Sequence, residues 1–268
     1  MAGETAIYGI VGENIDYSLS PAIFATLFKR HQVDAIYQRF DIGKAQLAAF
    51  VIAARTVPIA GFNVTIPHKE NITQYLSGCD PISTATGSVN LVINRAGKLH
   101  GHNTDYAGVA ASIEEKLALR VAGKRVIVVG SGGAARTVFY YLVQKRAAVI
   151  TVLHHSPARE KSFSKWARGI VGKAIYQSQM LNKRQAEFGD ADLVVNCTPE
   201  LIGRLFDRKS VGAMRRVFEL RYSSGRKPSK TYVSGEYMLA IQACEAYRII
   251  TGIKVAAEDM MRIVSRVS

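Results

Sequence analysis

The stretch Lys124-Arg125-Val126-Ile127-Val128-Val129-Gly130-Ser131-Gly132-Gly133-Ala134-Ala135 decides the fold of this chain. Its first half is rich in β-branched residues, as central strands of parallel sheets are. Its second half fits G-x-G-x-x-A, a loop whose backbone approaches a pyrophosphate closely while the following helix N-terminus supplies N–H donors. We therefore predict a dinucleotide-binding loop made of Gly130, Ser131, Gly132, Gly133 and Ala134.

Elements on either side of this stretch alternate between strand and helix patterns. Downstream, strands are expected at 148–153, 193–196 and 217–222; an amphipathic helix precedes the stretch at 105–117, and the tail is helical at 238–251 and 257–264. This order is typical of a doubly wound, Rossmann-like half.

The N-terminal third also alternates. We expect strands at 6–11, 36–40 and 62–66, the last ended by Pro67, and a helix at 42–54. Ser20-Pro21 opens another helix, with Ser20 as N-cap and Pro21 at the first helical position. A hairpin is expected from 88–94 and 99–102 around Ala96-Gly97. The whole chain is therefore predicted to be α/β.

Composition indicates a globular protein that binds small anions. The 268 residues are 48% hydrophobic and 21% charged, with a net charge of +14. The basic excess is diffuse, although denser at 204–230, and no basic helix carries interleaved aromatics, so we expect no nucleic-acid partner. Apolar stretches such as 47–54 are far below the roughly 20 residues of a membrane span. Met1-Ala2-Gly3-Glu4 lacks a basic leader region, so a cytoplasmic protein is expected.

Cysteine usage argues against a disulfide framework or a zinc site. Cys79, Cys197 and Cys244 are odd in number, widely spaced and without a C-x-x-C pair. We interpret them as small buried apolar residues, and we expect no metal.

Two polar, turn-rich segments end in groups suited to proton transfer. Gly61-Phe62-Asn63-Val64-Thr65-Ile66-Pro67-His68-Lys69 ends in an ammonium, and Asn103-Thr104-Asp105 in a carboxylate. Reduction of a ketone builds negative charge on its oxygen, which a nearby ammonium stabilises and can protonate. Asp105 would orient that ammonium, and it could at the same time cap the following helix. Together with a dinucleotide loop, this pair indicates an oxidoreductase.

The segment after the second predicted strand bears on the cofactor. NAD sites usually carry Asp or Glu about 20 residues after the glycine loop, on the ribose hydroxyls. Here the chain reads Leu153-His154-His155-Ser156-Pro157-Ala158-Arg159, without a carboxylate. This favours NADP, with NAD still possible. His155, Ser156 and Arg159 could bind its 2′-phosphate, and His154 is also predicted to bind the cofactor. The charge of His155 would depend on pH.

Taken in order, these motifs resemble the shikimate dehydrogenase family over essentially the whole chain. Ser18-Leu19-Ser20-Pro21 is similar to its S-x-S-P loop and residues 63–69 to its N-V-T-x-P-x-K signature. Three further matches are Gly87-Ser88-Val89-Asn90 to G-A-V-N, Gly101-His102-Asn103-Thr104-Asp105-Tyr106-Ala107-Gly108 to G-x-N-T-D-x-x-G, and Gly235-Glu236-Tyr237-Met238-Leu239-Ala240-Ile241-Gln242-Ala243 to G-x-x-M-L-x-x-Q-A.

The resemblance implies NADPH-dependent reduction of 3-dehydroshikimate to shikimate, in aromatic amino-acid biosynthesis. It makes Lys69 and Asp105 the catalytic pair, and its substrate-binding residues would be Ser18, Ser20, Asn63, Thr65, Lys69, Asn90, Asp105, Tyr222 and Gln242. Gln242 also breaks an otherwise apolar helical stripe, which favours a contact in a cleft. On the cofactor side, the resemblance adds Thr198, Gly235 and Met238.

The resemblance further implies two domains, with substrate and nicotinamide meeting between them. Residues 1–104 would bind substrate, with 238–268 folding back onto them, and 105–237 would bind NADP. The expected partner is the small-molecule substrate alone, and the expected state is a monomer or a homodimer.

Several segments depart from the family pattern. Tyr17 replaces a histidine, His154-His155-Ser156 replaces N-R-[ST], residues 196–203 only partly follow N-x-T-x-x-G-M, and Glu219-Leu220-Arg221-Tyr222 stands for D-x-x-Y. The stretch 223–234 is also short and is expected to lack one helix. Most of these changes lie on the nicotinamide side, which predicts altered cofactor handling.

Two alternatives follow. One is a quinate/shikimate dehydrogenase that uses NAD, although serine at both loop positions favours shikimate. The other is a non-catalytic regulator that senses NADP or binds nucleic acid.

Overall fold

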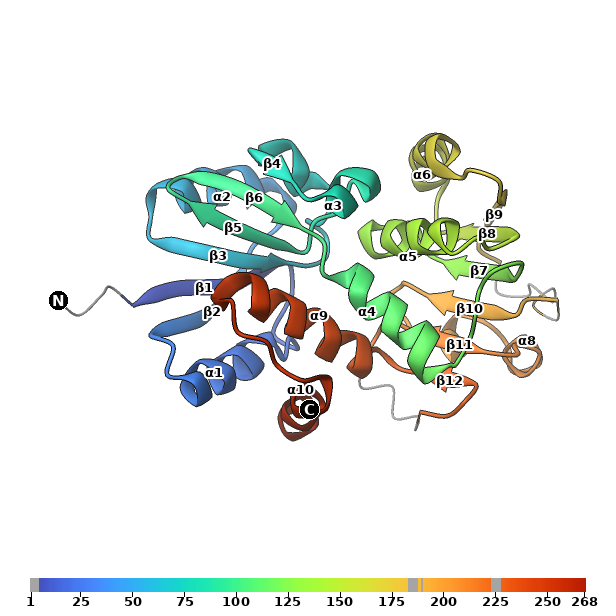
Figure 1. Cartoon of the computed structure of the whole chain (residues 1–268). Coiled ribbons are helices and arrows are strands. Elements are labelled where there is room, and N and C mark those ends of the chain that lie inside the picture. The colour runs from blue at the N-terminus through green and yellow to red at the C-terminus, as the bar shows by residue number, and fades with distance from the viewer. Residues whose placement is uncertain (1–4, 183–187, 189, 223–227) are drawn as a thin grey trace. The chain divides into compact units, whose positions relative to one another are not determined.

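The computed structural model describes residues 5–182, 188, 190–222 and 228–268. The chain divides into two compact units, each built around its own sheet (Figure 1). The first unit comprises Met1–Thr104 and Gln242–Ser268, and the second comprises Asp105–Ile241. The predicted α/β class is confirmed.

The first unit contains a mixed six-stranded sheet in the order β2-β1-β3-β5-β6-β4. β1 pairs in parallel with β2 and β3, β5 runs antiparallel to β3 and β6, and β4 pairs in parallel with β6. Because β5 is reversed, the end of β3, the start of β5 and the end of β6 lie at one edge. In chain order the strands are β1 Ala6–Gly12, β2 Ala35–Asp41, β3 Ile59–Val64, β4 Gly78–Cys79, β5 Leu91–Arg95 and β6 Lys98–His102.

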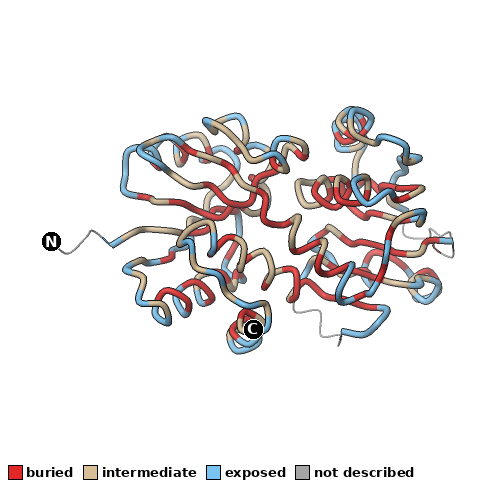
Figure 2. The backbone as a smooth tube through the Cα atoms, viewed as in Figure 1, coloured by how far each residue is buried: buried red, intermediate tan, exposed pale blue. Residues whose placement is uncertain are grey.

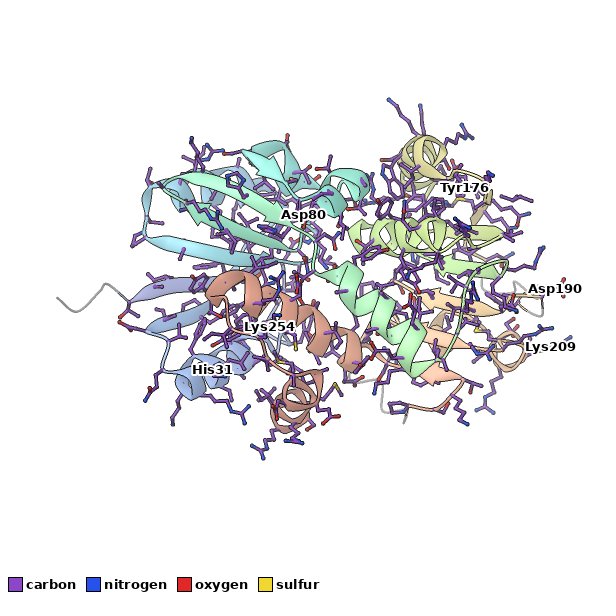
Figure 3. All side chains as sticks on the ribbon, in the orientation of Figure 1. His31, Asp80, Tyr176, Asp190, Lys209 and Lys254 are labelled. Carbon is purple, nitrogen blue, oxygen red and sulfur yellow. The ribbon has the colours of Figure 1, made fainter. Side chains whose placement is uncertain are left out.

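Helices cover this sheet, and the C-terminal segment returns to them. Tyr247, from the final turns of α9, packs on Phe24 and Phe28 of α1, with ring centroids 6.2 and 6.0 Å apart. Its hydroxyl lies 2.8 Å from Nδ1 of His31, which Figure 3 labels. The helical segments are α1 Ser20–His31, 3₁₀ turns Lys44–Gln46 and Asn71–Tyr75, α2 Leu47–Thr56, α3 Pro81–Thr86, α9 Gly235–Thr251 and α10 Ala257–Val267.

The start of α1 differs from the prediction that Ser20 is its N-cap. The helix begins at Ser20 itself, and the cap position is occupied by Leu19, whose apolar side chain makes no capping hydrogen bond. Ser18 Oγ instead accepts the backbone N–H of Ser20 at 3.4 Å. The first N–H of the helix is therefore bonded by Ser18, which lies outside the helix.

The second unit contains a parallel six-stranded sheet in the order β12-β11-β10-β7-β8-β9 (Figure 1). This is the 3-2-1-4-5-6 order of a Rossmann fold, so that half of the prediction is confirmed. The strand order reverses between β7 and β10, and ligands of such sheets bind beyond the carboxyl ends at this point. The strands are β7 Arg125–Val129, β8 Val149–His154, β9 Ile175–Met180, β10 Leu193–Asn196, β11 Val217–Glu219 and β12 Tyr232–Val233.

The central strands of both sheets are buried, as the red segments of Figure 2 show. Val128 and Ile150, for example, are fully buried in the second unit beneath α5 and α6. The predicted helix at 105–117 is α4 Asp105–Ala111 continued by a π-helical turn, Ser112–Lys116. The other helices of this unit are α5 Gly133–Gln144, α6 Pro157–Ile170, α7 Ile202–Leu205 and α8 Arg208–Gly212.

Two expectations fall partly or wholly on residues outside this description. The leader region Met1–Glu4 lies outside the described residues, and so does 223–227, part of the segment expected to lack a helix. Within the described part of the chain, no helix has the length and apolar character needed to cross a bilayer.

Candidate active site

Two buried amides meet at the edge of the first sheet where β3 ends and β5 begins. Asn63 Nδ2 donates to the carbonyl of Asn90 at 3.0 Å, and the Tyr37 hydroxyl donates to Asn63 Oδ1 at 2.7 Å. Asn63 is 6% and Asn90 3% exposed. Hydrogen bonds of this kind fix the orientation of a buried amide.

Asn90 extends this network to the segment after β6 and to α9. Its Oδ1 accepts the Thr104 backbone N–H at 2.7 Å, and its Nδ2 donates to Thr104 Oγ1 at 2.9 Å. Thr104 Oγ1 lies 3.3 Å from Oε1 of the half-buried Gln242. The two predicted substrate residues Asn90 and Gln242 are therefore neighbours through Thr104.

The serine loop joins the network through Tyr37. Ser18 and Ser20 are 5% and 6% exposed. Burial raises the pKa of Tyr37 well above its usual range, and a hydrogen bond with Ser20 opposes this shift only in part. Tyr37 therefore keeps its proton and donates to Asn63. One chain of hydrogen-bonded polar groups thus runs from Tyr37 to Gln242, with Ser20 beside Tyr37.

The backbone of Lys69 is fixed beside this network. Beyond β3, Thr65 N–H donates to the Val11 carbonyl at 2.9 Å. The Lys69 carbonyl accepts the N–H of Val89, the residue before Asn90, at 2.9 Å. Lys69 and Thr65 are both half-buried. The backbone that carries the predicted proton donor is thus held next to Asn90.

Asp80, labelled in Figure 3, anchors the segment that leads to Asp105. Its Oδ1 caps α3 by accepting Ser83 N–H at 2.6 Å, and its Oδ2 accepts Asn103 N–H at 3.0 Å. Asp105 follows Thr104 directly, is 4% exposed, and is the first residue of α4 in the second unit.

Sequence reasoning missed three residues at this edge of the sheet: Tyr37 and Thr104 of the network, and Asn103 beside it. Asn103 and Thr104 stand in a recognised motif, but only the carboxylate of that motif has an evident chemical role. Tyr37 lies in the middle of a strand, where the sequence offers no signal that its hydroxyl serves a site.

The glycine loop of the second unit has the conformation that a pyrophosphate site requires. Gly130 has φ of 100°, which side chains disfavour, and its N–H donates to the Leu153 carbonyl at 2.9 Å. A Cβ at Gly130 would lie 3.1 Å from Thr198 Cγ2. Among the described residues no side chain caps α5, whose cap position is Gly132. The loop and the helix N-terminus therefore fit a pyrophosphate.

Three of the predicted cofactor residues follow β8, and the fourth, His154, is the last residue of that strand. His155 and Arg159 are exposed, and Ser156 Oγ caps α6 by accepting Arg159 N–H at 3.4 Å. These three residues lie together at the start of α6, directly after β8.

His154 corrects the prediction made for it. Its side chain is fully buried with its ring on Phe163, 5.6 Å between centroids, and neither ring nitrogen has a hydrogen-bond partner in the described structure. Burial lowers its pKa and keeps it neutral. Because β8 ends with this residue facing the core, His154 does not present its ring to a phosphate.

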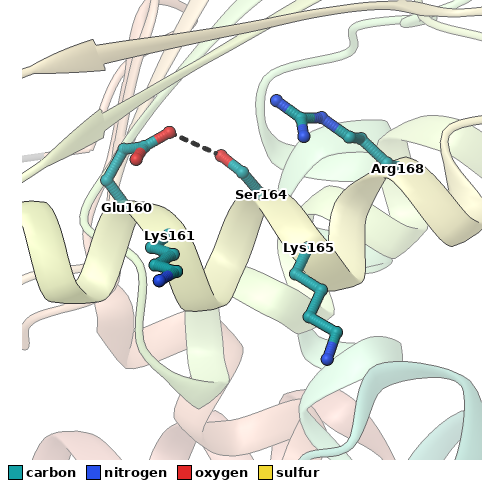
Figure 4. A pocket seen from close by; sticks show the side chains of 5 residues that line it. All are labelled: Glu160, Lys161, Ser164, Lys165 and Arg168. Atoms are coloured by element: carbon teal, nitrogen blue, oxygen red, sulfur yellow. Dashed lines mark hydrogen bonds between the residues drawn. The ribbon is translucent and has the colours of Figure 1, made fainter.

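A pocket on α6 lies outside the predicted residues (Figure 4); it is lined by Glu160, Lys161, Ser164, Lys165 and Arg168. Glu160 belongs to the first turn of α6, where a carboxylate would repel a phosphate. Its Oε1 accepts hydrogen bonds from Ser178 and Ser164, each at 2.8 Å, which lower its pKa. Figure 4 shows the carboxylate directed along the helix toward Ser164.

The remaining predicted residues have mainly packing contacts. Thr198 Oγ1 donates to Asn196 Oδ1 at 2.8 Å, so its hydroxyl is used within its own loop. Gly235 opens α9, and a Cβ there would collide with the Leu220 carbonyl oxygen. Met238 is 7% exposed and packs on Gly108. Tyr222 is half-buried, next to residues that the structure does not describe.

Comparison with known proteins places these two half-sites in a family. Residues 10–92 match the model of the shikimate dehydrogenase substrate binding domain. A solved shikimate dehydrogenase in complex with NADP+ is 26% identical, with a TM-score of 0.84 over 99% of this chain and 96% of that one. A quinate dehydrogenase from Corynebacterium glutamicum in complex with NAD is 25% identical, with a TM-score of 0.82 over 98% and 99%.

The relation extends to the full sequence. The shikimate dehydrogenase (NADP(+)) of Thermococcus kodakarensis is 30% identical over 275 residues, which cover 97% of this chain and 95% of the relative. An alignment of that length spans both units, including the serine loop, the buried amides and the glycine loop. The chain therefore belongs to the shikimate dehydrogenase family.

Proposed function

We propose that this protein is an NADP-dependent shikimate dehydrogenase, which reversibly reduces 3-dehydroshikimate to shikimate. The observation that carries the proposal is the hydrogen-bonded polar chain from Tyr37 through Asn63 and Asn90 to Gln242, with Ser20 beside Tyr37 and the Lys69 backbone fixed next to Asn90. A polyhydroxy carboxylate needs such a series of oriented donors and acceptors.

In this proposal most of the residues that bind the substrate belong to the first unit. Ser18 and Ser20 hold the carboxylate, and the hydroxyls are held by Asn63, Thr65, Asn90, Tyr222 and Gln242. The Lys69 ammonium stabilises the negative charge that develops on the ketone oxygen and gives that oxygen its proton. Asp105 orients the ammonium and accepts a hydrogen bond from a substrate hydroxyl.

The second unit binds the cofactor, and NADPH, when bound, supplies the hydride. Gly130 forms the turn, and the N–H groups of residues 131–134 hold the pyrophosphate. His155, Ser156 and Arg159 hold the 2′-phosphate, and Thr198, Gly235 and Met238 shape the nicotinamide side through their packing. We place the enzyme in the cytoplasm, as a monomer or a homodimer, with small molecules as its ligands.

The test is shikimate-dependent reduction of NADP+, followed at 340 nm. We expect turnover with shikimate and NADP+, and a lower kcat/KM with either quinate or NAD+. Absence of shikimate oxidation, combined with salt-sensitive binding of nucleic acid, would instead support a regulator.

A quinate/shikimate dehydrogenase that uses NAD is the second candidate. His155, which replaces the usual arginine, favours it, and so does the likeness to the quinate dehydrogenase solved with NAD. A kcat/KM for NAD+ above that for NADP+ would establish it.

A further inference from the structure

Glu219, the last residue of β11, is a carboxylate buried among neutral donors. It is 2% exposed. Its Oε2 accepts the Tyr232 hydroxyl at 2.6 Å, and its Oε1 accepts the Ile202 backbone N–H at 2.5 Å. Asn196 Nδ2 lies 3.4 Å from the same Oε1. These three donors are neutral, and burying a carboxyl group without a cation beside it is costly, which favours a role for Glu219 in holding its neighbours in place.

These contacts fix both ends of one loop, residues 197–201. Asn196 precedes the loop, and its Nδ2 also donates to the Glu200 carbonyl at 2.7 Å. Ile202 follows the loop and begins α7. Glu219 therefore holds the residue before the loop and the residue after it.

Arg221 holds the middle of the same loop. Its guanidinium donates to the Pro199 carbonyl at 2.9 Å. Between Glu219 and Arg221, the Leu220 N–H donates to the Asn196 carbonyl at 2.9 Å. Glu219, Leu220 and Arg221 thus hold the loop through hydrogen bonds to Asn196 before it, Pro199 within it and Ile202 after it.

The 197–201 loop lies against the glycine loop. β7 and β10 are neighbours at the position where strand order reverses. Cys197 N–H donates to the carbonyl of Val129, the residue before Gly130, at 2.9 Å. Thr198 Cγ2 is the atom that a side chain at Gly130 would meet first. The glycine loop therefore forms one side of the expected dinucleotide crevice, and residues 197–201 form the other.

We propose that Glu219 and Arg221 are positioning residues that hold the 197–201 loop in the shape that NADP binding requires. The inference rests on the proposed function, because it assigns this crevice to NADP. The inference also explains why two segments that depart from the family pattern, 196–203 and 219–222, are in contact. Their differences are joined in space by the hydrogen bonds of Glu219 and Arg221.

The test compares E219Q, R221M and the double variant with D192N. The E219Q change keeps the size of the side chain but leaves one acceptor oxygen, and R221M keeps an aliphatic stem without donors. Asp192 is the matched control, since it lies before β10 at the opposite edge of the sheet and accepts Arg125 N–H at 3.0 Å. NADP+ dissociation constants are measured by calorimetry, with KM for both substrates and the melting temperature.

We expect E219Q to weaken NADP+ binding about tenfold, the scale of one disrupted buried hydrogen-bonding group. R221M should weaken it less, because Arg221 is exposed. In the double variant, the loss of binding free energy for NADP+ should be smaller than the sum of the two single losses. The KM for shikimate should stay within about twofold of wild type. D192N should bind NADP+ as wild type does.

The inference is overturned if E219Q and R221M lower the melting temperature but bind NADP+ as wild type does, or if D192N weakens binding equally. Should E219Q fail to fold, R221M decides alone, since its side chain is exposed. Failure of wild type to bind NADP+ would overturn the proposed function and the inference together, whereas normal wild-type binding with unaffected variants removes only the inference.

Discussion

Loss of the Lys69 side chain should greatly lower activity and have only a modest effect on stability. Its carbonyl, rather than its ammonium, makes the structural contact with Val89, and that contact survives truncation. We expect Lys69→Ala to lower kcat by roughly 10²- to 10⁴-fold, the usual contribution of a positioned proton donor. Lys98→Ala, at an exposed lysine on β6, is the control and should leave kcat unchanged. Near-normal turnover of the Lys69 variant would remove Lys69 from the mechanism.

His154 should make the second unit sensitive to acid. Burial lowers its folded-state pKa below the 6.5 of a free histidine. The unfolded chain therefore binds the extra proton first, and the free energy of unfolding falls as pH drops through 6.5 toward the folded pKa. His154→Leu removes this titration, so urea unfolding between pH 7.5 and 5 should show a smaller loss of stability than in wild type. Equal losses in both proteins would contradict this account.

His155 should limit the preference for NADP+ over NAD+. An arginine carries a permanent charge and binds phosphate with two hydrogen bonds, whereas a histidine's charge depends on pH. We expect His155→Arg to tighten NADP+ binding by about fivefold, the upper range for an exposed ion pair. NAD+ lacks the 2′-phosphate and serves as the control within the same calorimetric experiment. Equal tightening of both cofactors would place the 2′-phosphate elsewhere.

At the scale of elements, the sequence predicts the helices and strands whose buried faces produce a regular pattern of apolar residues. The strand before Gly130 is an apolar β-branched run and was predicted at its observed position. β9 was missed, because it is an edge strand whose residues are mostly exposed and show neither an apolar run nor alternation. β4 and β12 are two residues each and too short to carry a signal.

The sequence predicted those site residues that belong to a recognisable motif. It missed those that reach the site only through the packing of the strands. Asn63, Asn90 and Gln242 come from motifs and belong to one hydrogen-bonded network with Thr104. Tyr37 joins them only because β2 and β3 lie on either side of β1. The error at His154 has a similar origin: composition identified a polar cluster, but only the structure shows which ring enters the core.

The turn between β7 and α5 should tolerate no side chain at Gly130. Alanine there would have to adopt φ of 100° and approach Thr198, so we expect Gly130→Ala to weaken NADP+ binding by more than about tenfold and to lower the melting temperature. Gly169→Ala is the matched control, because Gly169 lies in α6 with nothing within 4 Å of an added Cβ. It should be neutral or slightly stabilising. Unchanged NADP+ affinity in Gly130→Ala would argue against a pyrophosphate at this loop.

At the scale of the whole molecule, the net charge of +14 should act on ligand capture rather than on chemistry. The proposed substrate is a carboxylate, and NADP+ carries one phosphate more than NAD+, so a basic protein attracts both, and NADP+ more strongly than NAD+. Salt screens this attraction, since the Debye length falls from about 10 Å at 0.1 M to about 3 Å at 1 M. KM for NADP+ should therefore rise several-fold over that range.

Two comparisons separate this effect from a loss of structure. KM for NAD+ should rise less than KM for NADP+, because the smaller charge of NAD+ leaves less attraction to screen. The kcat should change little, because hydride and proton transfer follow binding, and the melting temperature at each salt concentration checks that the fold is intact. Equal rises for both cofactors would show that the 2′-phosphate does not feel the basic surface, and a fall in kcat without a rise in KM would place the effect of salt on the chemical step.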